Sequence, residues 1–307
     1  MNILSTFDGM SCGQIALNKA GIKYDNYFAS EIDKYAIEVT QHNYPNTKQI
    51  GSVVNVKAEN LPKIDLLIGG SSCQDFSVAG KQKGMVTKEE KPILSLEQYI
   101  KLKNEGFDFY GESYLFWEYV RLLKECKPKY FFLENVVMKR EWENLITSVL
   151  GVEPIKINSS LVSAQNRPRI YWTNIVDKLE IEDKGILLKD ITDYSSEYIF
   201  ISSEKTINRK HTKNYLQYDI NGKGHGSQDQ RAYYLNGKHG CLDTGASGKA
   251  KILLEDGTVR KATRIECERL QTVPDNYTIA VTESQAKSML GNGWTVDVIV
   301  EFFKNIK

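Results

Sequence analysis

The sequence lacks several features that mark other classes of protein. No apolar run approaches the roughly 20 residues that a membrane-spanning helix needs. The first nine residues enter a strand-like stretch without a basic start or a small-residue cleavage site, so we expect no secretory signal peptide and a cytoplasmic protein. Hydrophobic residues make up 41% and charged residues 26% of the 307 positions, which excludes a disordered chain.

Cysteine is scarce, and its spacing excludes the common zinc and redox motifs. The five cysteines are widely spread and form no Cys-x-x-Cys pair. We interpret them as free thiols and expect no bound metal. They are Cys12, Cys73, Cys126, Cys241 and Cys267.

Net charge is close to zero for the whole chain but not for its parts. Residues 200–264 contain twelve Lys or Arg and six Asp or Glu, a net charge of +6. The whole chain carries +1, which leaves −5 for the remainder. This asymmetry is typical of a surface that binds a polyanion, although a solvated loop face would show the same surplus.

The pattern of apolar residues predicts an α/β fold. Short apolar runs alternate with amphipathic stretches over the first 175 residues, as in βαβ units around a mostly parallel sheet. We expect helices over residues 14–20, 113–126, 283–290 and 294–303. The expected strands are residues 2–7, 24–30, 64–68, 130–133, 154–158 and 169–173.

Two stretches interrupt this alternation. Residues 77–112 show no clean core periodicity, which predicts a long binding loop or lid. Residues 176–277 are rich in glycine and are predicted to form a small, loop-rich second domain. Residues 1–175 and 278–307 are expected to form the other domain.

The first predicted strand ends in a turn suited to a nucleotide-like ligand. The sequence Phe7-Asp8-Gly9-Met10-Ser11-Cys12-Gly13 opens a helix, where backbone groups come close to such a ligand. Glu31 ends the second strand, where a carboxylate commonly binds ribose hydroxyls. Together they favour an adenosine-containing cofactor, although an ordinary βα turn and a surface glutamate explain the same residues. The absence of Gly-x-Gly-x-x-Gly argues against a nicotinamide-dependent dehydrogenase.

Reactive side chains follow further predicted strands. Residues 65–77 run from an apolar strand through two glycines to Cys73, which lies among polar residues as a nucleophile would. Glu134 follows an apolar strand and is a candidate proton donor or a helix-capping carboxylate. Arg167 and Arg169 precede or begin the last strand and are suited to bind phosphate or a carbonyl oxygen.

Taken in order, these residues form a set of motifs that resembles the cytosine-C5 DNA methyltransferase family. The similarity is to stand-alone phage or bacterial enzymes and to the catalytic domain of the eukaryotic de novo branch. It extends over nearly the whole chain outside the glycine-rich insert. The six motifs are Phe7-Asp8-Gly9-x-x-x-Gly13, Gly69-Gly70-Ser71-Ser72-Cys73-Gln74, Glu134-Asn135-Val136, Gln165-x-Arg167-x-Arg169, residues 264–271 and Leu290-Gly291-Asn292-Gly293-Trp294-Thr295-Val296.

The resemblance implies a Rossmann-like enzyme that uses S-adenosylmethionine to methylate C5 of a cytosine flipped out of double-stranded DNA. It makes residues 1–175 and 278–307 the catalytic domain and residues 176–277 the target-recognition domain. It assigns Cys73 as the nucleophile that adds to C6 and Glu134 as the group that protonates N3. Arg167 and Arg169 would orient the base, with Arg169 on O2. The resemblance places the cofactor against Phe7, Asp8, Gly9, Met10, Ser11, Cys12, Glu31, Ser52, Val53, Asn292, Gly293 and Trp294.

We expect this enzyme to act as a monomer, without a membrane or metal, as restriction-modification methyltransferases do. Two positions depart from the family pattern. Ser72 replaces the proline that usually precedes the nucleophile, and so loses its fixed φ. Ser52 stands where an aspartate usually binds the adenine amino group, and because a hydroxyl is the weaker acceptor we predict weaker cofactor binding.

Two alternatives share these motifs. One is a cytosine-C5 methyltransferase that acts on transfer RNA, as a branch of the same family does. The other is a catalytically inactive relative that only binds DNA. The presence of all four predicted catalytic residues argues against the second alternative.

Overall fold

The computed structural model describes residues 1–71, 76, 84–201, 209–218 and 228–307, and this part of the chain divides into two compact units. Residues 158–167 and 278–299 pack with the second unit, although we expected them in the catalytic domain. The division into a catalytic and a recognition domain stays a prediction. The first unit comprises Met1–Ile157, Pro168–Glu180 and Val300–Lys307, and the second comprises Asn158–Arg167 and Ile181–Ile299.

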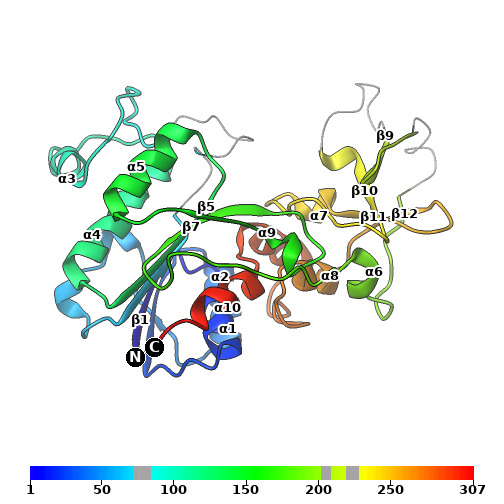
Figure 1. Ribbon diagram of the computed structural model, residues 1–307, viewed down its shortest axis with the longest axis horizontal. Coiled ribbons are helices and arrows are strands. Elements are labelled where there is room, and N and C mark those ends of the chain that lie inside the picture. The colour runs from blue at the N-terminus through cyan, green and yellow to red at the C-terminus, as the bar shows by residue number, and fades with distance from the viewer. Residues whose placement is uncertain (72–75, 77–83, 202–208, 219–227) are drawn as a thin grey trace. The chain divides into compact units, whose positions relative to one another are not determined.

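A seven-stranded, mostly parallel sheet forms the centre of the first unit, as predicted (Figure 1). Its strand order is β3-β2-β1-β4-β5-β7-β6, and β7 runs antiparallel to β5. All six expected strands are present, and a two-residue edge strand, β3, was missed. The strands are β1 Asn2–Thr6, β2 Asn26–Ser30, β3 Lys48–Gln49, β4 Leu66–Gly69, β5 Tyr130–Val136, β6 Ile155–Asn158 and β7 Pro168–Thr173.

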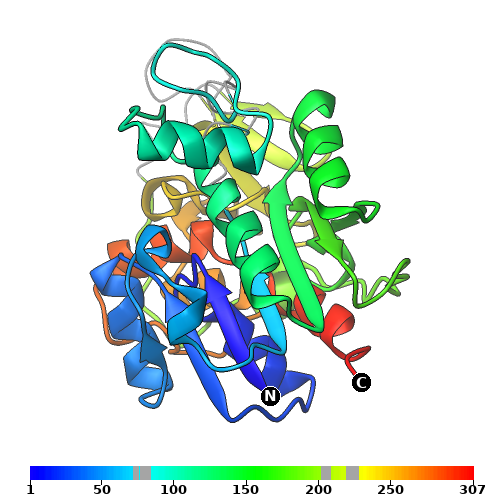
Figure 2. The same cartoon turned by 90° about the vertical axis from the view of Figure 1, so that its left-hand side faces the viewer.

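Alternating side chains bury both faces of this sheet, which is why its strands are apolar runs. On β5, Phe131 and Leu133 join the core cluster formed with α4 and α5. Phe132 points the other way, and its ring centroid lies 5.1 Å from that of Phe302 in α10. Helices therefore cover both faces (Figures 1 and 2). They are α1 Cys12–Lys19, α2 Lys34–Asn43, α3 Leu96–Asn104, α4 Phe116–Cys126, α5 Arg140–Leu150 and α10 Val296–Phe303.

Residues 84–112, part of the stretch 77–112 that was expected to be a long loop, contain a helix. They contain α3, which begins at the cap Ser95, whose hydroxyl accepts a hydrogen bond from the Gln98 amide. Met85 and Ile93 are fully buried in the core of the first unit. The expected helix over residues 113–126 is a 3-10 turn followed by α4.

The second unit contains a five-stranded sheet where a loop-rich domain was expected. Its order is β12-β11-β10-β9-β8, with β10 and β11 parallel and the other determined pairs antiparallel. Helices α8 and α9 begin at capping boxes, formed by Thr263 with Glu266 and by Thr282 with Gln285. The elements are β8 Arg209–His211, β9 Tyr215–Tyr218, β10 Arg231–Tyr234, β11 Lys251–Leu253, β12 Val259–Lys261, α6 Leu188–Ile191, α7 Ala246–Lys249, α8 Arg264–Leu270 and α9 Glu283–Asn292.

Within the described ranges, no helix has the length and apolarity needed to cross a lipid bilayer.

Candidate active site

The turn after β1 and the acid after β2 meet in the first unit, as their positions predicted. Phe7, Gly9 and Ser11 all have positive φ, between 56° and 60°, so the backbone turns sharply here. Glu31 is half-buried, and its carboxylate accepts hydrogen bonds from three backbone amides, including that of Gly9 at 2.7 Å. Because those amides fix the carboxylate, it is preorganised to accept hydrogen bonds from a ligand.

The side chain of Asp8, a residue of this turn, belongs to a buried hydrogen-bond network. Its carboxylate accepts hydrogen bonds from the Tyr27 hydroxyl at 2.7 Å and from the Ser11 hydroxyl. Gln14 extends the network by donating to Ser11 and Thr47. Burial raises the pKa of Asp8 to about 6 from its ordinary value of 3.8, although the hydrogen bonds from Ser11 and Tyr27 oppose the rise.

This pKa makes the stability of the protein depend on pH. The folded state holds the Asp8 proton up to about pH 6, whereas the unfolded chain releases it near its ordinary pKa of 3.8. The stabilisation linked to this proton is therefore present below pH 4 and is lost as the pH rises through 6, by about 3 kcal/mol at most. We expect urea unfolding between pH 4.5 and 7.5 to show this loss in the wild type and not in Asp8→Asn. Parallel stability curves for the two proteins would contradict the assignment.

Three further residues of the turn cannot offer exposed side chains to a cofactor. Met10, Ser11 and Cys12 are each at most 4% exposed. The Ser11 hydroxyl is used by Asp8 and Gln14. Any cofactor contact of these three residues therefore requires backbone atoms, which explains why the type of side chain there gives little information about the ligand.

Ser52 and Val53 lie at a short 3-10 turn, Val53–Asn55, after β3. Ser52 is the N-cap of this turn. Its backbone carbonyl accepts a hydrogen bond from the Asn55 amide, and its hydroxyl accepts no capping hydrogen bond from the turn. Gly51, with φ of 74°, receives a hydrogen bond on its carbonyl from the Ser30 hydroxyl at the end of β2. Ser52 is thus held close to the carboxyl end of β2, beside the residue that precedes Glu31.

A carboxylate at position 52 is expected to strengthen cofactor binding. Ser52→Asp supplies a charged acceptor for an amino group, which is worth about 1 kcal/mol more than a hydroxyl, or about fivefold in Kd. Calorimetric titration with S-adenosylmethionine measures the change, and Ser52→Ala is the control, which we expect to bind no tighter than the wild type. An aspartate variant whose affinity stays at the wild-type value would exclude this role for position 52.

Glu134 and Arg169 form an ion pair in the first unit. Because β7 runs antiparallel to β5, the start of β7 lies opposite the end of β5, and Arg169 is in register with Val136. The Nε atom of Arg169 lies 2.9 Å from Oε1 of Glu134, and both side chains are nearly nine-tenths buried, at 12% and 11% exposed. Glu134 lies within β5, two residues before its end, rather than after the strand as expected.

Asn135 connects this pair to the nucleophile motif. Its side-chain amide donates hydrogen bonds to the hydroxyl of Ser71 at 3.1 Å and to the Ser71 carbonyl at 3.3 Å. Ser71 lies two residues after the end of β4, past Gly70, and is buried. Cys73 lies outside the described residues, so its predicted role rests on its place two residues after Ser71. In the sequence, Asn135 is identified only as part of a motif. Its hydrogen bonds to Ser71 were not predicted.

Arg167 belongs to the second unit and has a structural task there. Its guanidinium donates hydrogen bonds to the carbonyls of Leu242, Gly291 and Gly293 at 2.8, 3.0 and 2.9 Å. Asn292, which lies between those two glycines, ends α9 and is exposed. Arg167 thus fixes the turn that carries three predicted cofactor residues, Asn292, Gly293 and Trp294. Sequence spacing alone did not indicate this role of Arg167.

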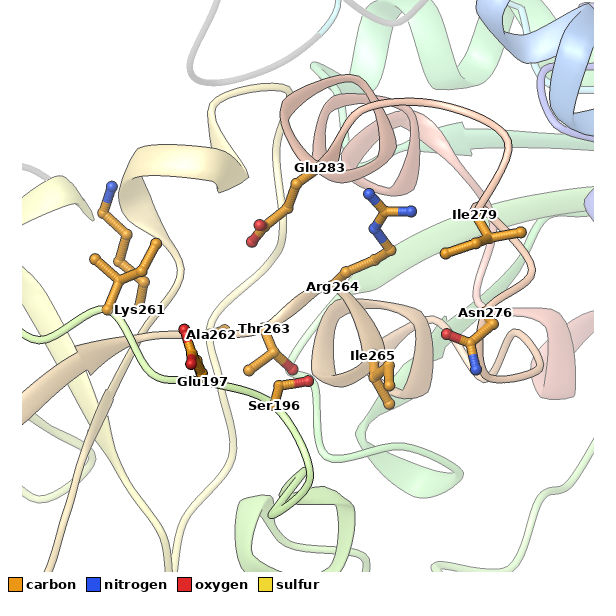
Figure 3. A pocket seen from close by; sticks show the side chains of 11 residues that line it. Ser196, Glu197, Lys261, Ala262, Thr263, Arg264, Ile265, Asn276, Ile279 and Glu283 are labelled. Carbon is orange, nitrogen blue, oxygen red and sulfur yellow. The ribbon is translucent and has the colours of Figure 1, made fainter.

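A separate cavity of about 240 Å³ lies in the second unit, at the start of α8 (Figure 3). Basic, acidic and apolar side chains all contribute to its wall. None of the predicted site residues is among them. The lining residues are Ser196, Glu197, Ile199, Lys261, Ala262, Thr263, Arg264, Ile265, Asn276, Ile279 and Glu283.

Comparison with known proteins connects these features to one family. Residues 1–147 and 155–307 match the family described as C-5 cytosine-specific DNA methylase. The chain belongs to this family. Its members use S-adenosylmethionine as the methyl donor, which confirms the predicted cofactor class.

Individual relatives agree with the family match. Type II methyltransferase M.HhaI of Haemophilus parahaemolyticus is 25% identical over 335 residues, which cover 100% of this chain and 94% of that protein. Orphan methyltransferase M.Rho11sI of Bacillus phage rho11s is 31% identical over 209 residues, which cover 64% of this chain. That stretch covers 37% of the phage protein, so the chain spans little more than a third of that relative's length.

Solved structures of low sequence identity share the fold. Entamoeba histolytica methyltransferase EhMeth matches with a TM-score of 0.70 at 14% identity, over 99% of this chain and 97% of that chain. Dnmt2 of S. pombe matches with a TM-score of 0.67 at 15% identity, over 98% and 96%. The predicted Rossmann-like methyltransferase fold is therefore confirmed.

The donor set of the first unit fits S-adenosylmethionine. The Glu31 carboxylate is fixed by three amides: Oε1 accepts two of these hydrogen bonds, and within the described residues Oε2 accepts one, from the Gly9 amide. A carboxylate oxygen accepts two hydrogen bonds, which leaves capacity for a ribose hydroxyl. The half-buried exposure of Glu31 and the sharp turn over residues 7–11 are what an adenosine group requires at the end of β2.

Proposed function

We propose that this protein transfers a methyl group from S-adenosylmethionine to C5 of a cytosine in double-stranded DNA. The observation that carries the proposal is the buried Glu134–Arg169 pair, connected through Asn135 to the backbone two residues before Cys73. This places an acid and a planar cation at the same end of β5, next to the strand that leads to the nucleophile. The family match supports the substrate and the methyl donor.

Cytosine C5 is a weak nucleophile, so the chain must activate it by transient covalent attachment. The Cys73 thiolate adds to C6, and Glu134, which must carry a proton in the complex with the base, gives that proton to N3 as charge moves into the ring. Arg169 holds Glu134 in place through its Nε, and the resemblance assigns its guanidinium to O2 of the base. When bound, S-adenosylmethionine supplies an electrophilic methyl group. Removal of the C5 proton by a base then expels the thiolate and restores the aromatic ring.

The second unit is proposed to recognise DNA. Residues 200–264 carry the basic surplus, and neutralising phosphates requires such a surface. On its sheet, the Arg231 guanidinium lies 4.9 Å from the centre of the Tyr215 ring, a contact that combines charge with a flat apolar surface.

The target cytosine must leave the duplex to reach Cys73, at a cost of a few kcal/mol that contacts to the flanking DNA offset. We propose that the enzyme acts as a monomer in the cytoplasm.

Transfer of labelled methyl groups tests this function. The purified protein and its Cys73→Ala variant are incubated with radiolabelled S-adenosylmethionine and either mixed genomic DNA or transfer RNA, and the labelled nucleoside is identified after digestion. We expect 5-methylcytosine in DNA from the wild type only. Label in transfer RNA instead of DNA would overturn the proposed substrate. If the wild-type protein transfers label to neither DNA nor transfer RNA, the proposed activity is wrong.

A further inference from the structure

Trp142, the third residue of α5, lies against the chain just after the nucleophile motif. Its indole is 93% buried, with 7% exposed, in the core of the first unit. The ring of Phe76 packs against it edge-on, with ring centroids 6.1 Å apart and an interplanar angle of 62°. Phe76 is itself 1% exposed. The residue three positions after Cys73 is therefore fixed by a large aromatic contact.

The backbone at Gly84 lies directly on the same indole. A Cβ atom at position 84 would stand 2.0 Å from Cε2, 2.3 Å from Cζ2 and 2.4 Å from Nε1 of Trp142. Gly84 also has φ of 70°, a conformation that side chains disfavour. Met85, the next residue, is fully buried. Trp142 thus contacts Phe76 and fits tightly against Gly84. In the sequence, these two residues directly precede and follow residues 77–83.

We infer that Trp142 is a positioning residue for the Cys73 nucleophile, an inference that rests on the proposed function. Ser71 and Phe76 are the described residues that precede and follow Cys73 in the sequence. Both are contacted by the stretch that runs from β5 into α5. Asn135 binds Ser71 on one side, and Trp142 packs on Phe76 on the other. Ser71 and Phe76, two residues before and three residues after Cys73, are thus both attached to this one stretch.

Such attachment matters because nucleophilic addition is sensitive to position. The thiolate must approach C6 to within about 3–3.5 Å along the correct direction, and a misplacement of about 1 Å costs about 100-fold in rate. Replacing the indole with a smaller side chain removes the surface on which Phe76 and Gly84 rest. The expected defect lies in covalent bond formation and not in cofactor binding.

The test measures covalent attachment directly. A duplex of mixed sequence, copied enzymatically with 5-fluorocytosine in place of cytosine, supplies targets without knowledge of the recognition sequence. After the thiolate adds to C6 and C5 receives the methyl group, fluorine cannot leave as a proton does, so the protein stays bound to the DNA. The rate of adduct formation, per site that binds S-adenosylmethionine, is followed on denaturing gels.

Trp117 provides a matched control for loss of a buried indole. It is 0% exposed in the same core, and its ring packs on Phe116 of α4. We expect Trp142→Leu to lower the adduct rate by about 10- to 100-fold with S-adenosylmethionine affinity within about twofold, and Trp142→Phe to restore most of the rate. Trp117→Leu should lower the midpoint of urea unfolding similarly but keep the adduct rate within about threefold.

Equal adduct rates for Trp142→Leu and Trp117→Leu would overturn the inference. Gly84→Ala is an independent variant that leaves the indole in the chain and displaces it, and it should lower the adduct rate as well. Combined with Trp142→Leu, it should cost less than the two separate effects predict, because the clash that it creates is then relieved. A wild-type protein that forms no adduct would contradict the proposed function rather than the role of Trp142.

Discussion

Cys73→Ala is expected to lower methyl transfer to DNA by at least about a thousandfold, because nothing else in the proposed mechanism activates C5. Removing the thiol leaves cytosine without the covalent bond at C6 that makes C5 nucleophilic. The cofactor residues lie in other segments, so S-adenosylmethionine affinity should change less than about twofold. Initial rates with labelled methyl donor and equilibrium titration measure the two quantities on the same preparation.

The control for this variant is another thiol of the first unit. Cys126 ends α4 and is partly exposed, and burial raises the pKa of its thiol. Such a thiol is mostly protonated and a poor nucleophile at neutral pH. Cys126→Ala should therefore keep the wild-type rate. If Cys73→Ala retains more than a tenth of that rate, the covalent mechanism is wrong for this protein.

Glu134→Gln is expected to lower kcat by about 10²- to 10⁴-fold, the usual contribution of a positioned proton donor. Glutamine keeps the shape of the side chain and still accepts a hydrogen bond from Arg169, but it has no acidic proton to give to N3. The change also leaves the nearly buried Arg169 without its counterion, which should lower the free energy of unfolding by about 2 kcal/mol. Single-turnover rates separate the chemical step from product release.

A second buried ion pair of the first unit separates catalysis from stability. Glu118 is 0% exposed and accepts hydrogen bonds from Tyr99, Lys103 and Arg121 at 2.6–2.7 Å. Glu118→Gln should lower the free energy of unfolding by about 3 kcal/mol and leave the single-turnover rate per folded enzyme unchanged. If the two glutamine variants lose activity in proportion to their stability, Glu134 has no chemical role.

The strands of the first unit could be predicted because a parallel sheet with helices on both faces requires apolar side chains in both directions. Residues 64–68 and 130–133 are such runs. Helix α3 was not predicted, because its stability depends on partners that lie far along the chain. Its buried Tyr99 and its Lys103 both bind Glu118 in α4, 19 and 15 residues away, and neither contact produces a local apolar pattern.

The motifs named Glu134, Arg167 and Arg169, but they predicted neither the Glu134–Arg169 ion pair nor the partners of Arg167. Glu134 and Arg169 lie on neighbouring antiparallel strands, so their register brings the side chains together. Arg167 precedes β7 and binds carbonyls that lie 75–126 residues away in sequence. Its spacing of two from Arg169 suggested a shared task, whereas the partners of a buried guanidinium depend on tertiary folding.

The path of the chain through the two units limits how the second unit, proposed to recognise DNA, can be exchanged among relatives. Residues 158–167 belong to the second unit but are separated from the rest of it by residues 168–180 of the first. Within this short segment, Gln165 accepts the Leu242 amide and donates to the Leu270 carbonyl. A chimera that replaces residues 181–299 alone would pair a foreign insert with a resident Gln165 and Arg167. Recombination that preserves folding must therefore carry both segments together, so an exchange of the second unit requires two coordinated crossovers on each side of β7.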